Sequence, residues 1–472
     1  MTRWLTVLAL GLTLVVPASA EVLTERDLTT ARELRERALE RDGGFEIVAD
    51  LTTRIGPRMA GTEADARAVE WAVELLEGIG FDRVWLEPVT FGTWHREFER
   101  VSITAPVADK QDLVALALGF SPATPAGGIE AEVVMFDDLA ALEAASPEAV
   151  DGRIVFIRNR MERTRDGSGY GPAVQARARG PQLAADKGAE AIVIRSIGTS
   201  TNRFAHTGGM RFDTASRVIP AVAISNPDAD QLERMMALGE PVRLHVEVGA
   251  EYVESYTSHN VIAEITGTES PEKVVALGAH LDSWDVGTGA LDDGAGIAII
   301  TEAARLILDL DERPNRSIQV IYFAAEEIGL LGGRAWAEKH HENFANYQLG
   351  AESDFGAGPV YEISARVSDE AWPVIEAIQR ELEPLGIELG GRQASGGPDF
   401  IPSLPHGLAV VDLKQDGTEY FDYHHTENDT LDKIDADDLA QNAAAYAVLA
   451  WLAAQSPIDF GSGPELLEAN QQ

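Results

Sequence analysis

The chain of 472 residues contains no cysteine, so it can form no disulfide, hold no metal through a thiolate and use no cysteine nucleophile. Basic residues are also scarce. The 38 Lys and Arg residues stand against 77 Asp and Glu residues, which gives a formal net charge of −39. This charge repels nucleic acid and anionic membrane surfaces, so we expect neither as a partner. Any metal ion must be held by histidine and carboxylate side chains.

One apolar run, at residues 5–16, lies at the start of the chain. Arg3 precedes it and Ala18-Ser19-Ala20 follow it, which is the pattern of a secretory signal peptide cleaved after Ala20. The run is shorter than the roughly 20 residues that a membrane span needs, and no later segment is apolar enough over that length. The sequence therefore predicts a signal peptide at 1–20 and an exported protein, in the periplasm or outside the cell.

The periodicity of apolar residues changes twice after the predicted signal peptide. Helical periodicity dominates residues 21–107, short β-rich runs dominate 108–255, and apolar strands alternate with amphipathic helices over 256–460. This change and return indicate a small domain inserted into a larger, discontinuous one. We expect the remaining residues, 461–472, to form a polar tail.

The alternation in the second half predicts an α/β sheet that is covered by helices on both faces. In such sheets, functional sites form beyond the carboxyl ends of the strands. We expect strands at 83–85, 101–103, 274–277, 317–323, 349–352 and 408–413, and helices at 28–39, 64–76, 294–308, 333–341, 371–385 and 438–453.

Histidine and carboxylate residues follow these predicted strands. His280 stands at the carboxyl end of one strand, and Asp292 lies on the glycine-rich loop that opens the next helix. The glycines let the backbone approach an ion closely, and a helix N-terminus tolerates carboxylates. Asp282 is well placed to accept the second N–H of the His280 imidazole and so to fix its tautomer.

The later strands end in further candidates. Glu326 and Glu327 are adjacent, and because successive side chains of an extended chain point to opposite sides, one can ligate a metal while the other faces the attacking water. Asp354 ends the next strand, and the pair His424-His425 follows the last. This set of nitrogen and oxygen ligands suits paired Zn²⁺. The pattern alone does not separate His424 from His425.

Two other carboxylates lie in the same segments. Asp285 and Asp293 could also be ligands. Turn stabilisation and helix capping explain these two residues better, because Asp293 immediately precedes a predicted helix and Asp285 stands in a loop.

Four segments of the chain resemble the co-catalytic zinc exopeptidases, the family that includes bacterial leucyl aminopeptidases and glutamate carboxypeptidase II. These segments are His280–Gly296, Glu326–Glu327, Glu352–Asp354 and His425–Thr430. The run His-Leu-Asp-Ser-Trp-Asp-Val-Gly at 280–287 is most similar to the plasma glutamate carboxypeptidase branch. The resemblance covers nearly all of the chain after the signal, and it implies that 108–255 is a protease-associated domain.

The resemblance implies a role for each candidate ligand. Asp292 would bridge two Zn²⁺ ions, with His280 and Asp354 completing the ligands of one ion and Glu327 and His425 those of the other. In the family, five residues ending in Asp-Thr follow the ligand histidine, as they do after His425, and this spacing selects His425 over its neighbour.

The resemblance also implies that Glu326 is the general base. It further implies a cis peptide bond between Asp292 and Asp293. Relatives carry a threonine where Gly397-Pro398 stand before Asp399, so the wall of the substrate pocket is expected to differ here.

The function implied is that of a zinc-dependent exopeptidase with two Zn²⁺ per chain, acting on dipeptides or short peptides, and the family suggests a homodimer. An aminopeptidase for longer peptides is the alternative. A non-catalytic binding protein of the transferrin-receptor type and a single-zinc glutaminyl cyclase share the fold. The first is disfavoured because all five ligand candidates and the base are present, and the second because of the inserted domain.

The inserted region carries no ligand candidate, and we expect it to form a wall or lid that restricts the metal cleft to short peptides. Its Gly-rich segment His206-Thr207-Gly208-Gly209 is typical of a mobile loop. For His206 itself, a surface turn is the favoured interpretation.

Overall fold

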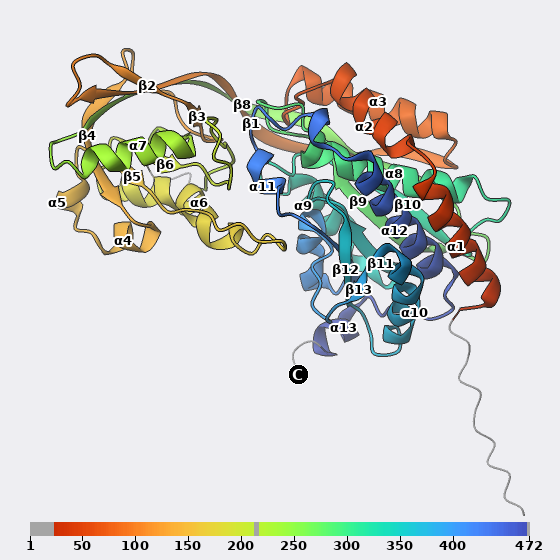
Figure 1. Ribbon diagram of the computed structural model, residues 1–472. Helices are drawn as coiled ribbons and strands as arrows, with labels where there is room; N and C mark the ends of the chain where they lie inside the picture. The colour runs from red at the N-terminus through yellow and green to blue at the C-terminus, as the bar shows by residue number, and fades with distance from the viewer. Residues whose placement is uncertain (1–22, 212–216, 470–472) are drawn as a thin grey trace, which may run out of the picture.

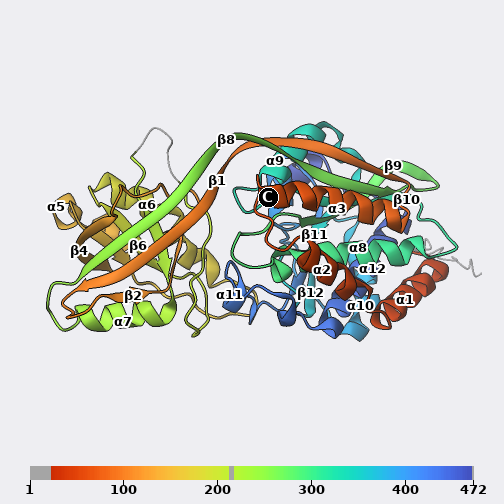
Figure 2. The same cartoon turned by 90° about the horizontal axis from the view of Figure 1, so that it is seen from above.

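A computed structural model describes residues 23–211 and 217–469, so the signal peptide predicted at 1–20 lies outside the described residues. The chain forms a larger and a smaller lobe, joined by the two strands β1 and β8 (Figure 1). Both strands are long, Arg83–Ala105 and Arg243–Ile265, and they pair antiparallel along their whole length. Figure 2 shows them running side by side from one lobe into the other.

The larger lobe contains most of the helices. Its elements are α1 (Glu25–Leu39), α2 (Gly43–Arg54), α3 (Glu63–Ile79), β9 (Ser270–His280), η1 (Ala290–Gly294), α8 (Ala295–Leu308), β10 (Arg316–Phe323), α9 (Leu331–His340), η2 (His341–Asn346), β11 (Tyr347–Glu352), β12 (Val360–Arg366), α10 (Trp372–Leu382), η3 (Glu383–Leu385), β13 (Glu388–Leu389), η4 (Pro398–His406), β14 (Val410–Gln415), α11 (Tyr420–Tyr423), η5 (Leu431–Lys433), α12 (Ala436–Gln455) and α13 (Pro464–Ala469).

The sheet of the larger lobe has the strand order β13-β12-β14-β11-β9-β10-β8. It is mixed: β9 is parallel to β10 and β11, β8 is antiparallel to β10, and β12 is antiparallel to β14 but parallel to β13. In this register His280 lies opposite Phe323, and Glu352 lies opposite Gly278. The carboxyl ends of β9, β10 and β11 therefore meet at one edge, as the sequence predicted for the site.

Helices cover both faces of this sheet. In β9, Val275 and Leu277 pack into the core shared with α8 and α12, whereas Val274 and Ala276 pack against Trp336 of α9 and its neighbours. Almost every residue of α12 is buried, and the Asp435 side chain caps its first turn. The predicted α/β sheet with helices on both faces is thus confirmed.

The smaller lobe is built around a second run of strands, β4-β5-β6-β7-β3, of which β4 to β7 are parallel. Strands β5, β6 and β7 are buried over their whole length, as apolar strands covered by helices are. The elements are β2 (Gln111–Leu113), β3 (Ala115–Ala117), β4 (Ile129–Phe136), α4 (Leu139–Ala144), α5 (Pro147–Val150), β5 (Ile154–Ile157), α6 (Tyr170–Asp186), β6 (Ala191–Arg195), β7 (Ala221–Ile224) and α7 (Asn226–Met236).

The structure differs from the sequence prediction in three elements. The short strands expected at 83–85 and 101–103 are the two ends of the single strand β1, whose register shifts at three points and so interrupts the alternation that reveals a strand. Helix α2 was not predicted, because it opens with the poor helix formers Gly43-Gly44. Strand β12 was not predicted either, since polar residues interrupt its apolar pattern.

The stretch expected to be a polar tail, 461–472, contains a short helix. Residues 464–469 form α13, and Leu466 is buried in the main core. Among the described residues, no helix combines the length and the apolar character that a bilayer crossing requires.

Candidate metal centre and active site

The five predicted metal ligands come together at the carboxyl edge of the larger sheet. His280 Nε2 lies 3.1 Å from Asp292 Oδ1 and 3.5 Å from Asp354 Oδ1. His425 Nε2 lies 3.3 Å from Asp292 Oδ2 and 3.0 Å from Glu327 Oε2. The two carboxylate oxygens of Asp292 therefore face two different histidines, which is the arrangement that a bridging carboxylate requires.

The chemistry of these side chains fits a pair of divalent ions. Asp292 Oδ2 and Glu327 Oε1 are buried and accept no hydrogen bond from the described residues. Such burial is costly, because the charge loses its hydration and the His425 imidazole, 3.3 Å from Asp292 Oδ2, offsets only part of the loss. Histidine nitrogens and carboxylate oxygens are the ligands that Zn²⁺ takes in cysteine-free sites, so bound ions would satisfy these atoms.

Burial and neighbouring charges have opposing effects on the pKa values of His280 and Glu326. Burial lowers the pKa of His280, but the Asp354, Asp282 and Asp292 carboxylates outweigh it and raise that pKa well above the ordinary value. Burial raises the pKa of Glu326 well above its ordinary value, reinforced by Asp354 and Glu327 and opposed by His280. Such dense negative charge favours binding of cations.

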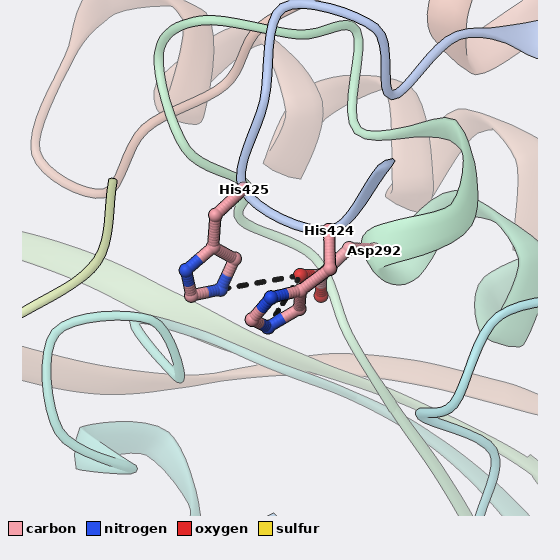
Figure 3. A group of neighbouring side chains, drawn as sticks. All are labelled: Asp292, His424 and His425. Atoms are coloured by element: carbon pink, nitrogen blue, oxygen red, sulfur yellow. Dashed lines mark ion pairs between the residues drawn. The ribbon is translucent and has the colours of Figure 1, made fainter. Parts of the chain in front are cut away.

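The two adjacent histidines differ although their rings stack, with centroids 3.5 Å apart (Figure 3). His424 Nε2 lies 3.7 Å from Asp292 Oδ2, whereas His425 also reaches Glu327. Burial and the neighbouring His425 lower the pKa of His424 well below its ordinary value. Burial also lowers the pKa of His425, but Glu327 and Asp292 overcome this and raise it to about 9. The geometry favours His425 as the ligand.

Asp282 connects the first histidine to the two glutamates. Its Oδ1 and Oδ2 accept hydrogen bonds from the backbone N–H groups of Glu326 at 3.0 Å and Glu327 at 3.3 Å. His280 Nδ1 lies 3.0 Å from the Asp282 carbonyl oxygen and 3.6 Å from the carboxylate. Asp282 thus orients His280 through its backbone more closely than through the carboxylate expected from the sequence.

The other two carboxylates have structural partners. Asp293, one residue before the N-cap Gly294, accepts hydrogen bonds from the N–H groups of Gly296 in the first turn of α8 at 3.0 Å and of His280 at 3.1 Å. The peptide bond between Asp292 and Asp293 is cis, as the family implied. Asp285 forms an ion pair with Arg96, with 2.8 Å between Nε and Oδ2, so its role is an ion pair and not the expected turn.

Two residues that support the site had not been assigned a role. Asp429 Oδ1 accepts the Leu291 N–H at 2.6 Å and Oδ2 accepts the Asp292 N–H at 3.2 Å, which fixes the bridging residue. Burial and the Asp292 charge raise the pKa of Asp429 to about 7. The fully buried Arg58 donates to carbonyl oxygens of the glycine-rich loop. Only the Asp-Thr spacing hinted at Asp429, and nothing in the sequence pointed to Arg58.

A cavity of about 390 Å³ opens in front of the predicted ligands and is lined by both lobes. Pro398, which was expected from the resemblance to alter the pocket wall, forms part of the lining of this cavity. The larger lobe contributes Glu326, Asp354 and Tyr420, and the smaller lobe contributes Tyr170, Arg177 and Arg211.

His206 of the smaller lobe is buried, so its interpretation as part of a surface turn is wrong. Its side chain points at the larger lobe, where Nδ1 lies 2.7 Å from the His424 carbonyl oxygen. Gly198 makes room for the ring, because a Cβ there would lie 2.1 Å from an imidazole atom. No sequence pattern predicts this pairing between residues eight positions apart.

Comparison with known proteins agrees with this site. Residues 260–450 match peptidase family M28. Carboxypeptidase Q of Bos taurus is 34% identical over 410 residues, which cover 87% of this chain and 85% of the bovine protein. The chain belongs to peptidase family M28. It is therefore a metallo-exopeptidase whose substrates are peptides, and the family resemblance predicted from the sequence is confirmed.

Solved structures support the same conclusion for the fold. The crystal structure of a peptidase M28 precursor from Shewanella amazonensis SB2B is 49% identical, covers 93% of this chain and 99% of its own, and superimposes with a TM-score of 0.91. The aminopeptidase from Aneurinibacillus sp. strain AM-1 is 22% identical with a TM-score of 0.63 over 92% of this chain and 98% of its own, and it shares the fold.

Proposed function

We propose that this M28 peptidase binds two Zn²⁺ ions, with Asp292 shared between them. The observation that carries the proposal is the position of Asp292, whose two oxygens lie 3.1 Å and 3.3 Å from the Nε2 atoms of two histidines. When bound, the ions would supply Lewis acidity, which polarises the scissile carbonyl and lowers the pKa of water. The proposed ligands are His280 and Asp354 on one side, Glu327 and His425 on the other, and Asp292 between them.

Glu326 is the proposed general base. It borders the cavity, and the hydrogen bond from its N–H to Asp282 fixes its backbone beside the ligand Glu327. Burial, together with Asp354 and Glu327, raises its pKa, and a carboxylate with a raised pKa is a better proton acceptor. Glu326 takes a proton from the attacking water and delivers it to the amine that leaves when the peptide bond breaks.

Dipeptides or short peptides are the proposed substrates. The cavity of about 390 Å³ is walled on one side by the smaller lobe, through Tyr170, Met210 and Phe120. A wall opposite the proposed zinc pair limits the length of peptide that can extend past the scissile bond. The similarity to carboxypeptidase Q is consistent with an exopeptidase that acts on such peptides.

The test uses the zinc-loaded chain with a panel of free dipeptides, the same dipeptides blocked at either terminus, and peptides of three to six residues. We expect two zinc ions per chain by elemental analysis, loss of activity on chelation with recovery on adding zinc, and the highest kcat/KM on free dipeptides. Equal or better cleavage of the longer peptides would replace the dipeptide assignment with an aminopeptidase one. Fewer than two bound ions would contradict the shared metal site.

A further inference from the structure

We propose that the smaller lobe is part of the metal centre, because its residues His206 and Thr207 orient His425, and that His206 is a positioning residue. This inference rests on the proposed function, in which His425 ligates zinc. It assigns the smaller lobe a task besides walling the cavity: without the lobe, the ligand histidine would lose the partner that fixes its ring.

The first step concerns the ring nitrogen of His425 that does not face the carboxylates. A histidine that ligates through Nε2 carries its proton on Nδ1, and that N–H needs an acceptor to hold the ring in place. His425 Nδ1 lies 3.3 Å from the Thr207 carbonyl oxygen, a group of the smaller lobe. For comparison, His280 Nδ1 lies 3.0 Å from the carbonyl of Asp282 in its own segment. Both histidines thus meet a carbonyl, but only one of these comes from the other lobe.

The second step concerns the backbone of the histidine pair. The Thr207 N–H donates to the His425 carbonyl oxygen at 3.0 Å, and His206 Nδ1 donates to the His424 carbonyl oxygen at 2.7 Å. Two successive carbonyls of the larger lobe are therefore held by two successive residues of the smaller lobe. Since His425 has a left-handed backbone, with φ 60°, these bonds support a conformation that most residues avoid.

The third step shows that the lobe holds His206 and Thr207 firmly. The Thr207 carbonyl also accepts a hydrogen bond from Arg177 Nη1 at 3.0 Å, and the Thr207 hydroxyl donates to the Ala117 carbonyl at 2.8 Å. The His206 N–H donates to Ser196 Oγ at 2.9 Å. Both residues are buried, so their positions are tied to the strands of the lobe. A shift of the lobe would move the acceptor of His425 with it.

The lobe also contacts the segment that leads to the histidine pair. The Thr199 N–H donates to the Phe421 carbonyl at 2.9 Å, and Thr199 Oγ1 donates to Asp422 at 2.8 Å. Arg163 pairs with the same Asp422 carboxylate and donates to the Thr418 carbonyl at 2.6 Å. The contact therefore extends from residue 418 to 425, and it does not depend on one side chain.

The test compares two substitutions of His206 in the full chain. His206→Asn keeps an N–H donor near the position of Nδ1, whereas His206→Leu removes it and keeps a branched side chain. His245→Leu is the matched control, because His245 also contacts a backbone carbonyl, that of Gly127, at 2.9 Å but lies away from the site. Zinc affinity is measured by chelator competition with elemental analysis, and kcat and KM are measured at saturating zinc.

For His206→Leu we expect one of the two zinc ions to bind more weakly, by up to the roughly 10- to 100-fold that altering the outer support of a ligand costs, because the carbonyl that precedes His425 loses its donor. We also expect a lower kcat with little change in KM. His206→Asn should recover most of both losses, and His245→Leu should match the wild type. Wild-type zinc affinities and kcat in His206→Leu would overturn the inference, and so would equal losses in the leucine and asparagine variants.

If His206→Leu does not fold, the double variant Arg163→Gln/Thr199→Val tests the inference instead. It weakens the contact between the smaller lobe and residues 418–425 without changing His206. Weaker binding of one zinc ion by this variant supports the inference, and unchanged binding of both overturns it. Failure of the underlying function looks different. A wild-type chain that binds fewer than two zinc ions contradicts the proposed metal pair, whatever the His206 variants do.

Discussion

The ligands of the proposed metal centre are supported in two different ways. His280, Glu327 and Asp354 form a strand-borne half, and His425 forms a loop-borne half. His280 is the last residue of β9, and Glu327 and Asp354 follow the ends of β10 and β11 by four and two residues, so the sheet brings the segments that carry them together. His425 follows the four-residue helix α11, and its nearest support is a pair of residues from the other lobe. The difference teaches that ligands at strand ends are supported from within their own lobe, as Asp282 supports His280 and Glu327, whereas the loop ligand His425 is supported by the other lobe.

Removing Asp292, the residue proposed to bind both zinc ions, should have the largest effect. Asp292→Ala deletes the one carboxylate that faces both histidines, so we expect zinc content to fall below one ion per chain and turnover to become undetectable. Elemental analysis after gel filtration, with a peptidase assay, measures both. Asp432→Ala, a change at an exposed carboxylate, is the control. Two tightly held ions in the Asp292 variant would refute the sharing.

Changing the base should separate chemistry from metal binding. Glu326→Gln keeps the shape of the side chain but cannot accept a proton, so kcat should fall by about 10² to 10⁴-fold. Zinc content should stay at two ions per chain, because Glu326 is not among the proposed ligands. Loss of zinc in this variant would move Glu326 into the ligand set and end its assignment as the base.

The histidine pair tests the half of the site that depends on the loop. His425→Ala should lose one zinc ion and nearly all activity, since it removes a contact to both Glu327 and Asp292. His424→Ala should keep both ions and lose less than about 10-fold in kcat, the low end of the cost of altering an outer residue of a metal site. Similar zinc loss in the two variants would show that the pair acts together, and the distinction drawn from the contact between His425 and Glu327 would fail.

The sequence predicts the strand-borne half of the site better than the other half. His280 and the Glu326–Glu327 pair are recognisable because they directly follow apolar strands, and strand ends gather at one edge of a sheet. His425 has no such signal, and only the spacing to the Asp-Thr pair in related peptidases selects it. Much of the element order of the larger lobe was likewise predictable from regular periodicity, except for α2 and β12, whose sequences lack it.

The missed features share a physical cause, which is that they act through backbone atoms or through space left by glycine. Thr207 contributes a carbonyl oxygen, which every residue type possesses, and Arg58 binds only carbonyls. His206 is buried because Gly198 has no side chain, a pairing that composition cannot reveal. The long strand β1 was predicted only at its two ends, because its register shifts break the alternation of buried and exposed residues between them.

The smallest expected effect on the site comes from a charge that touches neither half. Glu87 of β1 lies 2.9 Å from Lys339 and 3.1 Å from His340 of α9. Burial raises the pKa of Glu87, but hydrogen bonds from His340 and Lys339 outweigh it and lower the pKa to about 2. Because the folded pKa lies below the unfolded value, the ion pair stabilises the fold above about pH 4.5, and this contribution is lost as pH falls toward 2.

Glu87→Gln should therefore lower the free energy of unfolding at pH 7 by about 1 to 2 kcal/mol, which is less than the full shift implies because solvent screens part of the interaction. The loss should shrink as pH falls through 4.5, since the wild type then loses the same stabilisation. Urea unfolding of the metal-free chain across this pH range measures it without interference from zinc. Zinc affinity and kcat at pH 7 should equal those of the wild type. A change in either would mean that β1, the strand that carries the smaller lobe, transmits strain at α9 to the metal centre, and the contrast between the two halves would no longer be local.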